Sequence, residues 1–237
     1  MPAMDDATFL AAYDPAAFPP LAVAVDVVPL TFAAGMLHAL LNRRAEAPAR
    51  GRLALPGSFV RSGEDLGAAA RRALRDKAGL DAPVRQFHAF GAVDRDPRMR
   101  IISIGYMAVV DADTMARAGD VSGTCELLPI AGGLVRSATG RRTSLPFDHD
   151  AILARALADL RRDLDRDDWA FGLLPQAFSL RELQALHEAI RGQTLNKPAF
   201  RKRLIESGRL EATGEMESGK GFRPAELYRA RRAEDAA

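Results

Sequence analysis

The sequence predicts an α/β domain with a mixed sheet, followed by a small C-terminal domain built around two adjacent helices. Three observations predict this arrangement. Strand-like and helix-like runs alternate from Leu21 to Leu164, two amphipathic helical segments follow a polar break at 165–168, and basic residues gather near the end of the chain. The 237 residues suffice for one large domain or two smaller ones, and an apolar fraction of 48% is enough for packed cores.

The first domain is predicted from its strand-like runs and one long helix. Four runs rich in β-forming residues predict strands, at Leu21–Leu30, Met36–Asn42, Gln86–Val93 and Arg100–Val110. Apolar residues recur at helical spacing between Asp148 and Leu164, which predicts a helix. Strands that alternate with helices indicate an α/β/α sandwich with a mixed sheet.

Residues 55–80 predict a loop followed by a helix and carry a recognisable motif. They read LPGSFVRSGEDLGAAARRALRDKAGL and resemble the box of the Nudix family, G-x5-E-x7-R-E-U-x-E-E-x-G-U, where U is a bulky aliphatic residue. The matching residues are Glu64, Arg72, Leu74, Gly79 and Leu80, whereas Ser58 replaces the first glycine. An amphipathic helix with a glycine C-cap would explain part of this pattern, but not the matches in the loop.

The acidic centre of this motif is missing. Its three carboxylates, by which a working box holds Mg²⁺, fall on Ala73, Asp76 and Lys77, which are predicted to share one helix face. Mg²⁺ requires oxygen ligands in near-octahedral geometry, and Ala73 offers none, while the ammonium of Lys77 repels the cation. The resemblance implies a Nudix-type fold, and the altered residues predict a domain that binds its ligand without a metal site and without hydrolysis.

The second domain is predicted from helix-capping signals. Ser179 and Glu182 have the spacing of a capping box, and Gly192 is expected to end the helix that they start. A second helix is expected to begin at Asn196, with Pro198 in its first turn, because proline is tolerated there.

Two short strands joined by a glycine-containing loop follow the second helix, so the order of elements is that of a winged helix-turn-helix. The expected segments are a leader at 1–19, the α/β domain at 20–165, a linker at 166–176, the winged domain at 177–232 and a tail at 233–237.

The charges of the second domain favour DNA binding. Residues 177–237 contain twelve Lys and Arg and nine Asp and Glu, a net charge of +3. Recognition helices read bases and phosphates with a few basic or amide side chains. The candidates are Arg201 and Arg203 for bases, Asn196, Lys197 and Lys202 for phosphates, and Lys220 and Arg223 in the expected wing. A solvated helix face would also explain the basic run at 201–203.

Taken together, the two domains resemble Nudix-related transcriptional regulators of the NrtR type. Four further stretches carry this resemblance, at 94–110, 145–149, 178–203 and 223–229. The resemblance implies a regulator, often a repressor, of NAD metabolism genes whose Nudix domain binds ADP-ribose or a related nucleotide. Helix-turn-helix dimers bind paired half-sites, so a homodimer on a near-palindromic operator in double-stranded DNA is the expected assembly.

The resemblance also suggests which residues bind the effector. Arg95 and Arg98 are the candidates for the diphosphate, since guanidinium groups pair well with phosphate oxygens, although a turn whose charges face water would also explain them. Arg52 and Phe59 flank the box loop and are weaker candidates for phosphate and base contacts. His149 is either part of the pocket or a core histidine.

Composition excludes several classes of protein. A single cysteine, Cys125, excludes an internal disulfide and a cysteine zinc site, and the four histidines lack metal-ligand spacing. The longest apolar run, Leu21–Val28, contains Asp26 and is too short to span a bilayer, and the N-terminus shows no secretory signal. We therefore expect a cytoplasmic protein without a membrane partner.

Two alternative functions remain open from the sequence. One is a Nudix hydrolase of ADP-ribose or another nucleoside diphosphate derivative that uses acids outside the box, such as Glu126. The other is a nucleotide-binding scaffold whose C-terminal domain contacts protein in place of DNA.

Overall fold

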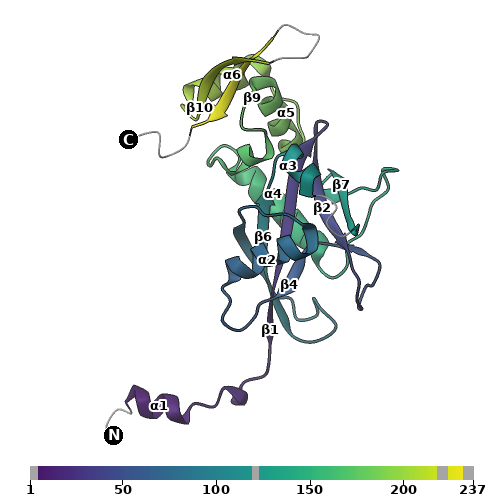
Figure 1. Ribbon diagram of the computed structural model, residues 1–237, viewed down its shortest axis with the longest axis vertical. Helices are drawn as coiled ribbons and strands as arrows, with labels where there is room; N and C mark the ends of the chain where they lie inside the picture. The colour runs from purple at the N-terminus through teal and green to yellow at the C-terminus, as the bar shows by residue number, and fades with distance from the viewer. Residues whose placement is uncertain (1–4, 119–122, 218–223, 232–237) are drawn as a thin grey trace.

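A mixed sheet of eight strands forms the centre of the first domain in the computed structural model, which describes residues 5–118, 123–217 and 224–231 (Figure 1). The sheet order is β5-β6-β1-β2-β7-β8, with β3 paired to β2 and β4 paired to β1. The strands are β1 (Ala22–Ala33), β2 (Met36–Arg43), β3 (Leu53–Ala54), β4 (Gly57–Phe59), β5 (Arg85–Phe90), β6 (Ile101–Val109), β7 (Cys125–Ala131) and β8 (Leu134–Val135). β1 and β6 run parallel, and the other pairings within the described strands are antiparallel.

Helices cover both faces of this sheet. α2 (Leu66–Ala78) and α3 (Ala112–Ala118) pack on one face, and α4 (His149–Asp163) packs on the other. Side chains of a strand alternate between faces, so Val25 and Val27 of β1 meet α2 while Val28 and Leu30 meet the α4 side. The predicted α/β/α sandwich of Nudix type is confirmed.

The ends of α2 follow from its sequence. The side chain of Asp65 accepts a hydrogen bond from the backbone N–H of Ala68 at 2.8 Å and caps the first turn. Gly79 ends the helix with φ of 62°, a left-handed conformation that glycine adopts without a steric penalty.

The second domain has the predicted winged helix-turn-helix order. It contains α5 (Leu180–Arg191), α6 (Lys197–Glu206) and a three-stranded sheet of order β10-β11-β9, with β9 (Phe178–Ser179), β10 (Leu210–Met216) and β11 (Glu226–Ala230). The capping box of Ser179 and Glu182 is formed, and Gly192 ends α5 with φ of 71°. Both predictions from the capping signals are confirmed.

The segment between the domains is more ordered than a solvent-exposed linker. Residues 166–176 contain the short helix η2 (Trp169–Leu173), and Ala170, Phe171, Leu173 and Leu174 are buried. They join one apolar core that extends from Val28 in the sheet to Leu204 in α6. The boundaries at 166–176 remain our proposal, but the two domains are packed together through this segment.

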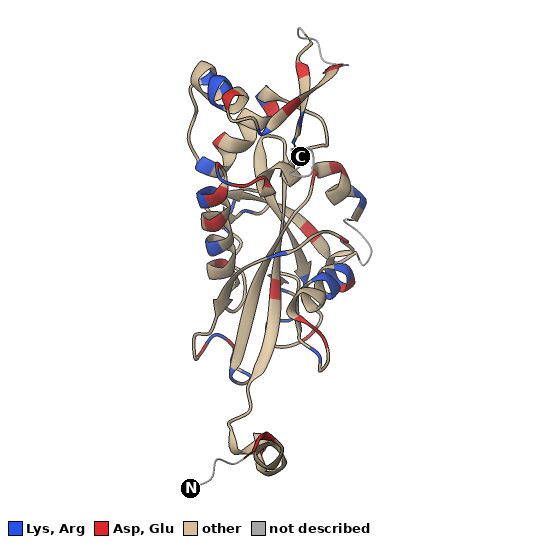
Figure 2. Cartoon of the chain, turned by 90° about the vertical axis from the view of Figure 1, so that its left-hand side faces the viewer, with Lys and Arg blue, Asp and Glu red and all other residues tan. Residues whose placement is uncertain are grey.

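The leader contains a helix that the sequence did not predict. α1 (Asp6–Ala12) and the short helix η1 (Pro15–Ala17) extend away from the sheet (Figures 1 and 2). Neither contains a buried residue, and their large apolar side chains are exposed, among them Phe9, Leu10, Tyr13 and Phe18. Within the described part of the chain, no helix is long and apolar enough to cross a membrane.

Candidate functional site

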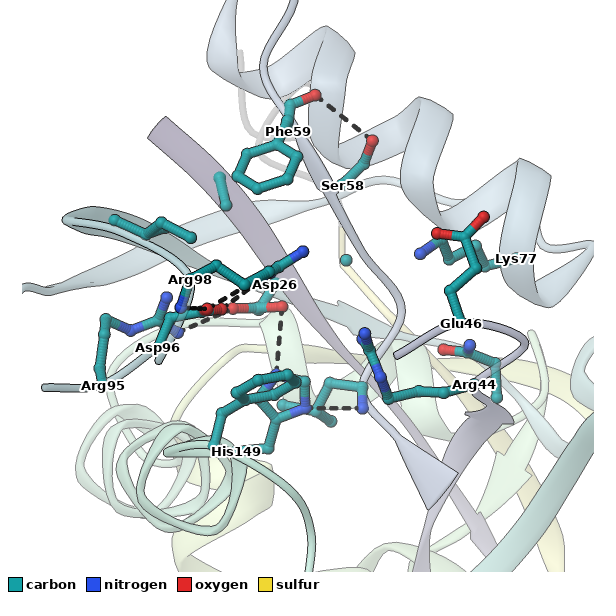
Figure 3. A pocket seen from close by; sticks show the side chains of 16 residues that line it. Asp26, Arg44, Glu46, Ser58, Phe59, Lys77, Arg95, Asp96, Arg98 and His149 are labelled. Atoms are coloured by element: carbon teal, nitrogen blue, oxygen red, sulfur yellow. Dashed lines mark hydrogen bonds and ion pairs between the residues drawn. The ribbon is translucent and has the colours of Figure 1, made fainter. Parts of the chain in front are cut away.

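A polar cavity of about 200 Å³ lies beside the first strands of the sheet (Figure 3). Its walls come from β1, the segment after β2, the box loop, the last turn of α2, the loop before β6 and the start of α4. Eight of its residues carry ionisable side chains: Asp26, Arg44, Glu46, Lys77, Arg95, Asp96, Arg98 and His149. The elements that form a Nudix fold therefore gather charged groups from distant parts of the sequence.

Arg95 is buried in this wall and bound by two carboxylates. Its side chain is 4% exposed, and it donates to both oxygens of Asp148 at 2.8 and 2.6 Å and to Asp26 at 3.2 Å. Such a bidentate pair fixes the guanidinium in one orientation. Arg95 thus lines the cavity, but two of its nitrogens are used to hold the wall together.

His149, the first residue of α4, is buried and neutral. Its Nδ1 accepts a hydrogen bond from the backbone N–H of Leu55 at 3.0 Å, which places its proton on Nε2, 3.5 Å from Asp26. Burial lowers the pKa of His149 despite that carboxylate. His149 therefore joins the box loop to α4 and β1, which combines the two roles open for it from the sequence.

The burial of Asp26 depends on Gly57, a glycine of the box loop. A Cβ on Gly57 would lie 2.2 Å from the Oδ1 of Asp26 and 2.9 Å from the carbonyl oxygen of Val25. Asp26 also accepts a hydrogen bond from the hydroxyl of Ser103 at 2.6 Å. Gly57 thus lets the box loop approach β1 closely enough to bury this carboxylate.

Arg98 and Phe59 lie together at the cavity. The Arg98 guanidinium is 5.2 Å from the centre of the Phe59 ring and donates to both oxygens of Asp96 at 2.9 and 2.8 Å. This pairing lowers the pKa of Asp96. The side chain of Arg98 is 40% exposed, so it remains accessible to a ligand in the cavity.

Arg52 does not line this cavity. It borders a neighbouring open pocket together with Phe147 and Asp148, and it donates to the carbonyl oxygen of Ser144 at 3.0 Å. Three of the four predicted effector residues, Arg95, Arg98 and Phe59, are therefore brought together, and the fourth, Arg52, lines the neighbouring pocket that shares Arg95 and Phe147 with the cavity.

Two cations in the cavity were not among the predicted binding residues. Arg44 follows β2, donates from Nε to the carbonyl oxygen of Pro48 at 2.8 Å, and lies 5.0 Å over the Phe147 ring. Lys77 reaches the cavity from the last turn of α2. From the sequence, Lys77 is expected only to repel a metal ion. Its position in the box could also have marked it as a residue that lines the cavity.

The matched residues of the box form a structural clamp. Arg72 donates to both oxygens of Glu64 at 2.7 Å, to the hydroxyl of Ser58 at 2.9 Å and to the carbonyl oxygen of Phe59 at 2.9 Å. The Arg72 guanidinium lowers the pKa of Glu64 to about 2. The loop–helix scaffold of the box is therefore intact.

The altered residues of the box lie in three different environments, although their i, i+3, i+4 spacing places them within one broad face of the helix. Ala73 is buried in the core between α2 and the sheet, Asp76 is exposed outside the cavity lining, and Lys77 lines the cavity. The face of α2 that packs against the sheet is narrower than the arc of the helix that the three positions span. Their side chains therefore enter different environments.

The residues present do not fit the Mg²⁺ that a Nudix fold implies. Asp26 and Asp96 are bound by arginines, which leaves Glu46 as the one cavity carboxylate without an ion pair among the described residues. The resolved ranges contain no group of three or more His, Cys, Asp or Glu side chains that could hold a metal ion. Glu126, considered above as an outside acid, pairs with Arg43 and lies outside the cavity.

The second candidate surface is α6, at the end of the molecule farthest from α1 (Figures 1 and 2). Lys202 is 76% exposed and lies 3.9 Å from Glu206, and Lys197 is exposed at the helix start. Arg203 is half-exposed and lies 3.8 Å from Asp165. Asn196 caps the helix by accepting from the N–H of Ala199 at 3.0 Å.

Arg201, on the same helix, is partly buried, and its Nε has no hydrogen-bond partner among the described residues. The remaining two predicted DNA-binding residues, Lys220 and Arg223, lie outside the residues that the structure describes.

A Nudix fold with a charged cavity, joined to a winged helix with an exposed basic helix, defines the class of Nudix-related winged-helix regulators. Family models agree with this division: a NUDIX domain matches residues 20–136, and the NrtR DNA-binding winged helix domain matches residues 170–230. The chain belongs to the NrtR family.

Relatives of known character support this assignment. The chain is 34% identical to the ADPR responsive transcriptional repressor NtrR of Acinetobacter baylyi, over 93% of this chain and 86% of that protein. It is similar to the crystal structure of Shewanella oneidensis NrtR complexed with a 27mer DNA, with a TM-score of 0.77 and 26% identity over 90% of this chain and 95% of that one. The NUDIX domain of Shewanella oneidensis NrtR complexed with ADP ribose matches with a TM-score of 0.51 and 28% identity over 66% of this chain and 99% of that one.

Proposed function

We propose that this protein is a DNA-binding transcriptional repressor that responds to ADP-ribose, or a closely related nucleotide, bound in the cavity of its Nudix domain. The observation that carries the proposal is the presence in one chain of a cation-rich Nudix cavity and an exposed basic helix in a winged domain. The Acinetobacter repressor and the Shewanella complexes with DNA and ADP-ribose support both halves.

The effector contacts are assigned by charge and accessibility. Arg98 and Phe59, which lie together and are both partly exposed, are suited to a phosphate and an aromatic base, because guanidinium groups bind phosphate and rings stack on bases. Arg95 shapes the wall and contributes charge while bound to Asp148. Arg52 would contact a part of the ligand that extends past Phe147.

DNA binding is assigned to the start and exposed face of α6 and to the wing. Asn196, Lys197 and Lys202 are the proposed phosphate contacts, and Arg201 and Arg203 are the proposed base contacts, which requires Arg203 to leave Asp165. Lys220 and Arg223 complete the proposed surface from the wing.

The proposed assembly is a homodimer on a near-palindromic operator. Exposed aromatic residues of the leader support it, since Phe9, Tyr13 and Phe18 contact one another but leave large apolar surfaces in water in a single chain. NAD metabolism genes as targets and a cytoplasmic location are part of the same proposal. Sedimentation of the full chain beside a variant that lacks residues 2–19 tests the assembly.

Coupling between the two sites is proposed to run through α4. Its N-terminal end meets the cavity through Asp148 and His149, and Asp165, just past its C-terminal end, pairs with Arg191 of α5 and Arg203 of α6. A ligand that prefers one arrangement of this helix would shift the population of winged-domain arrangements.

Fluorescence anisotropy with labelled duplexes tests the proposal. The duplexes come from regions upstream of NAD biosynthesis genes and of the protein's own gene, with excess nonspecific competitor, with and without ADP-ribose. Saturable binding to one duplex that weakens with ADP-ribose is expected. Specific binding that ignores ADP-ribose would retain the repressor and reject this effector, and loss of all binding in competitor would reject the DNA-binding role.

We further propose that the Nudix domain does not hydrolyse its ligand. The support is the replacement of two acids of the box: Ala73 lies in the core and Lys77 lines the cavity. Incubation with ADP-ribose and Mg²⁺, followed by chromatography for AMP, is expected to show no multiple turnover. Sustained release of AMP would establish the hydrolase alternative.

A further inference from the structure

The charges of the cavity divide into compensated and uncompensated groups. Arg95 is neutralised by Asp26 and Asp148, and Arg98 is neutralised by Asp96. By contrast, neither Arg44 nor Lys77 makes an ion pair with any residue in the described ranges. These two side chains are therefore the cations of the cavity that an anionic ligand would neutralise.

Arg44 and Lys77 approach the cavity from different elements. Arg44 is oriented by its bond to the carbonyl oxygen of Pro48 and by the Phe147 ring beneath it. Lys77 comes from α2, and Figure 3 shows it on the same side as Glu46. Although Lys77 is exposed as a whole residue, partial desolvation at the cavity, together with the neighbouring Arg44, lowers the pKa of its ammonium.

Lys77 also stands at a box position where a hydrolase carries a metal-binding carboxylate. A metal bridges the negative phosphates and negative carboxylates of such a site. A lysine in place of a carboxylate removes the need for this bridge, because its ammonium can contact a phosphate oxygen directly. The same positive charge excludes a divalent cation from that space.

We infer that the cavity binds a diphosphate without a metal ion, and that Lys77 and Arg44 supply the positive charge that Mg²⁺ supplies in a Nudix hydrolase. This inference rests on the proposed effector site and specifies its charge chemistry. Glu46 lies on the same side of the cavity as Lys77. Its carboxylate competes with the diphosphate for Lys77 and so lowers the affinity of the cavity for the diphosphate. Binding is therefore independent of Mg²⁺ and sensitive in opposite directions to changes at Lys77 and Glu46.

Calorimetric titration of the full chain with ADP-ribose, in EDTA and in millimolar Mg²⁺, tests the inference. Equal affinity is expected in both buffers. Lys77→Met and Arg44→Met are each expected to weaken binding about tenfold or more, because a hydrogen bond to a charged group contributes enough for that change. Glu46→Gln is expected to tighten binding. Arg75→Met is the matched control, since Arg75 is exposed on the same helix and outside the cavity lining.

The outcomes separate this inference from the proposed function. Binding that requires Mg²⁺, or that is unchanged in Lys77→Met, overturns the inference while ADP-ribose remains the effector. If ADP-ribose does not bind in either buffer, inorganic pyrophosphate is titrated in EDTA. Pyrophosphate binding that Lys77→Met weakens supports a metal-free diphosphate site with another effector, and its absence overturns both. Thermal melts confirm that each variant is folded, and Glu46→Gln tests the charge logic by a gain that unfolding cannot produce.

Discussion

The guanidinium of Arg95 and the carboxylate of Asp148 form a bidentate pair that joins the loop before β6 to the residue preceding α4. Because Arg95 is 4% exposed, the pair is shielded from water and from salt. The contact also fixes the start of α4 relative to the cavity.

Removal of Arg95 is expected mainly to destabilise the fold, whereas removal of Arg98 is expected mainly to weaken ligand binding. Arg95→Met leaves Asp148 and Asp26 without their buried cation, which costs roughly 3 kcal/mol of unfolding free energy. Arg98→Met removes a guanidinium that is 40% exposed but leaves the 5% exposed carboxylate of Asp96 without its cation, so it should cost less than Arg95→Met, roughly 1–2 kcal/mol. Urea unfolding beside ADP-ribose titration checks both, and equal stabilities would contradict this distinction.

Restoring the box acids is expected to fail at position 73. Ala73 is 1% exposed in the core, so Ala73→Glu places a carboxylate among apolar side chains and should cost roughly 3 kcal/mol or more. Lys77→Glu, at an exposed cavity position, is the control and should unfold at nearly the wild-type urea concentration. A stable Ala73→Glu variant that hydrolyses ADP-ribose would contradict the proposed separation of fold and chemistry.

Loss of Lys202 is expected to weaken DNA binding evenly across sequences. Its ammonium is exposed and suited to a phosphate, so Lys202→Ala should reduce the slope of log affinity against log salt by about 1 without changing site preference. Arg155→Ala on α4 is a matched control, because Arg155 also makes an i,i+4 pair, here with Asp159. Anisotropy at several salt concentrations measures the slope, and an unchanged slope would remove Lys202 from the interface.

The winged domain is expected to lose stability in mild acid because of His187. Burial lowers its pKa to about 4 from an ordinary value of 6.5, and its ring lies 4.9 Å from that of Phe200. Between pH 6.5 and about pH 4, His187 is protonated in the unfolded chain but not in the folded chain. The stability that is fully present above pH 6.5 is therefore lost as the pH falls toward about 4.

The expected loss attributable to His187 is on the order of 2 kcal/mol between about pH 7.5 and about pH 5. Urea unfolding of wild type and His187→Gln at both pH values isolates this contribution, and His88→Gln at an exposed position is the control. An equal pH dependence in wild type and His187→Gln would show that this histidine does not cause the loss.

Elements with strong local signals could be predicted from the sequence. The helices α2 and α5 are bounded by capping side chains and left-handed glycines, and the strand β1 is a long, mostly apolar run interrupted by Asp26 and Thr31. These features act over a few residues, so they are visible without a partner. Short strands such as β3 and β8 depend on pairing with distant strands and were not predicted.

The separate roles of Arg95 and Arg98 could not be predicted. They stand three positions apart in one polar loop, yet one is buried and the other accessible. The difference arises because Asp148 and Asp26 lie 53 and 69 positions away in the sequence but meet Arg95 in the fold. Arg44 escaped prediction for the same reason, because the cavity assembles it with residues from five other segments.

In the proposed coupling, α4 acts as a lever between the cavity and the winged domain. α4 has 15 residues and is therefore about 22 Å long, so a tilt of a few degrees at its cavity end displaces its far end by about 1 Å. In the proposed homodimer, a shift of that size would change how the two winged domains span successive turns of a duplex. The strength of the proposed coupling between effector and operator would therefore depend on the stiffness of one helix, a mechanical property that belongs to neither binding surface alone.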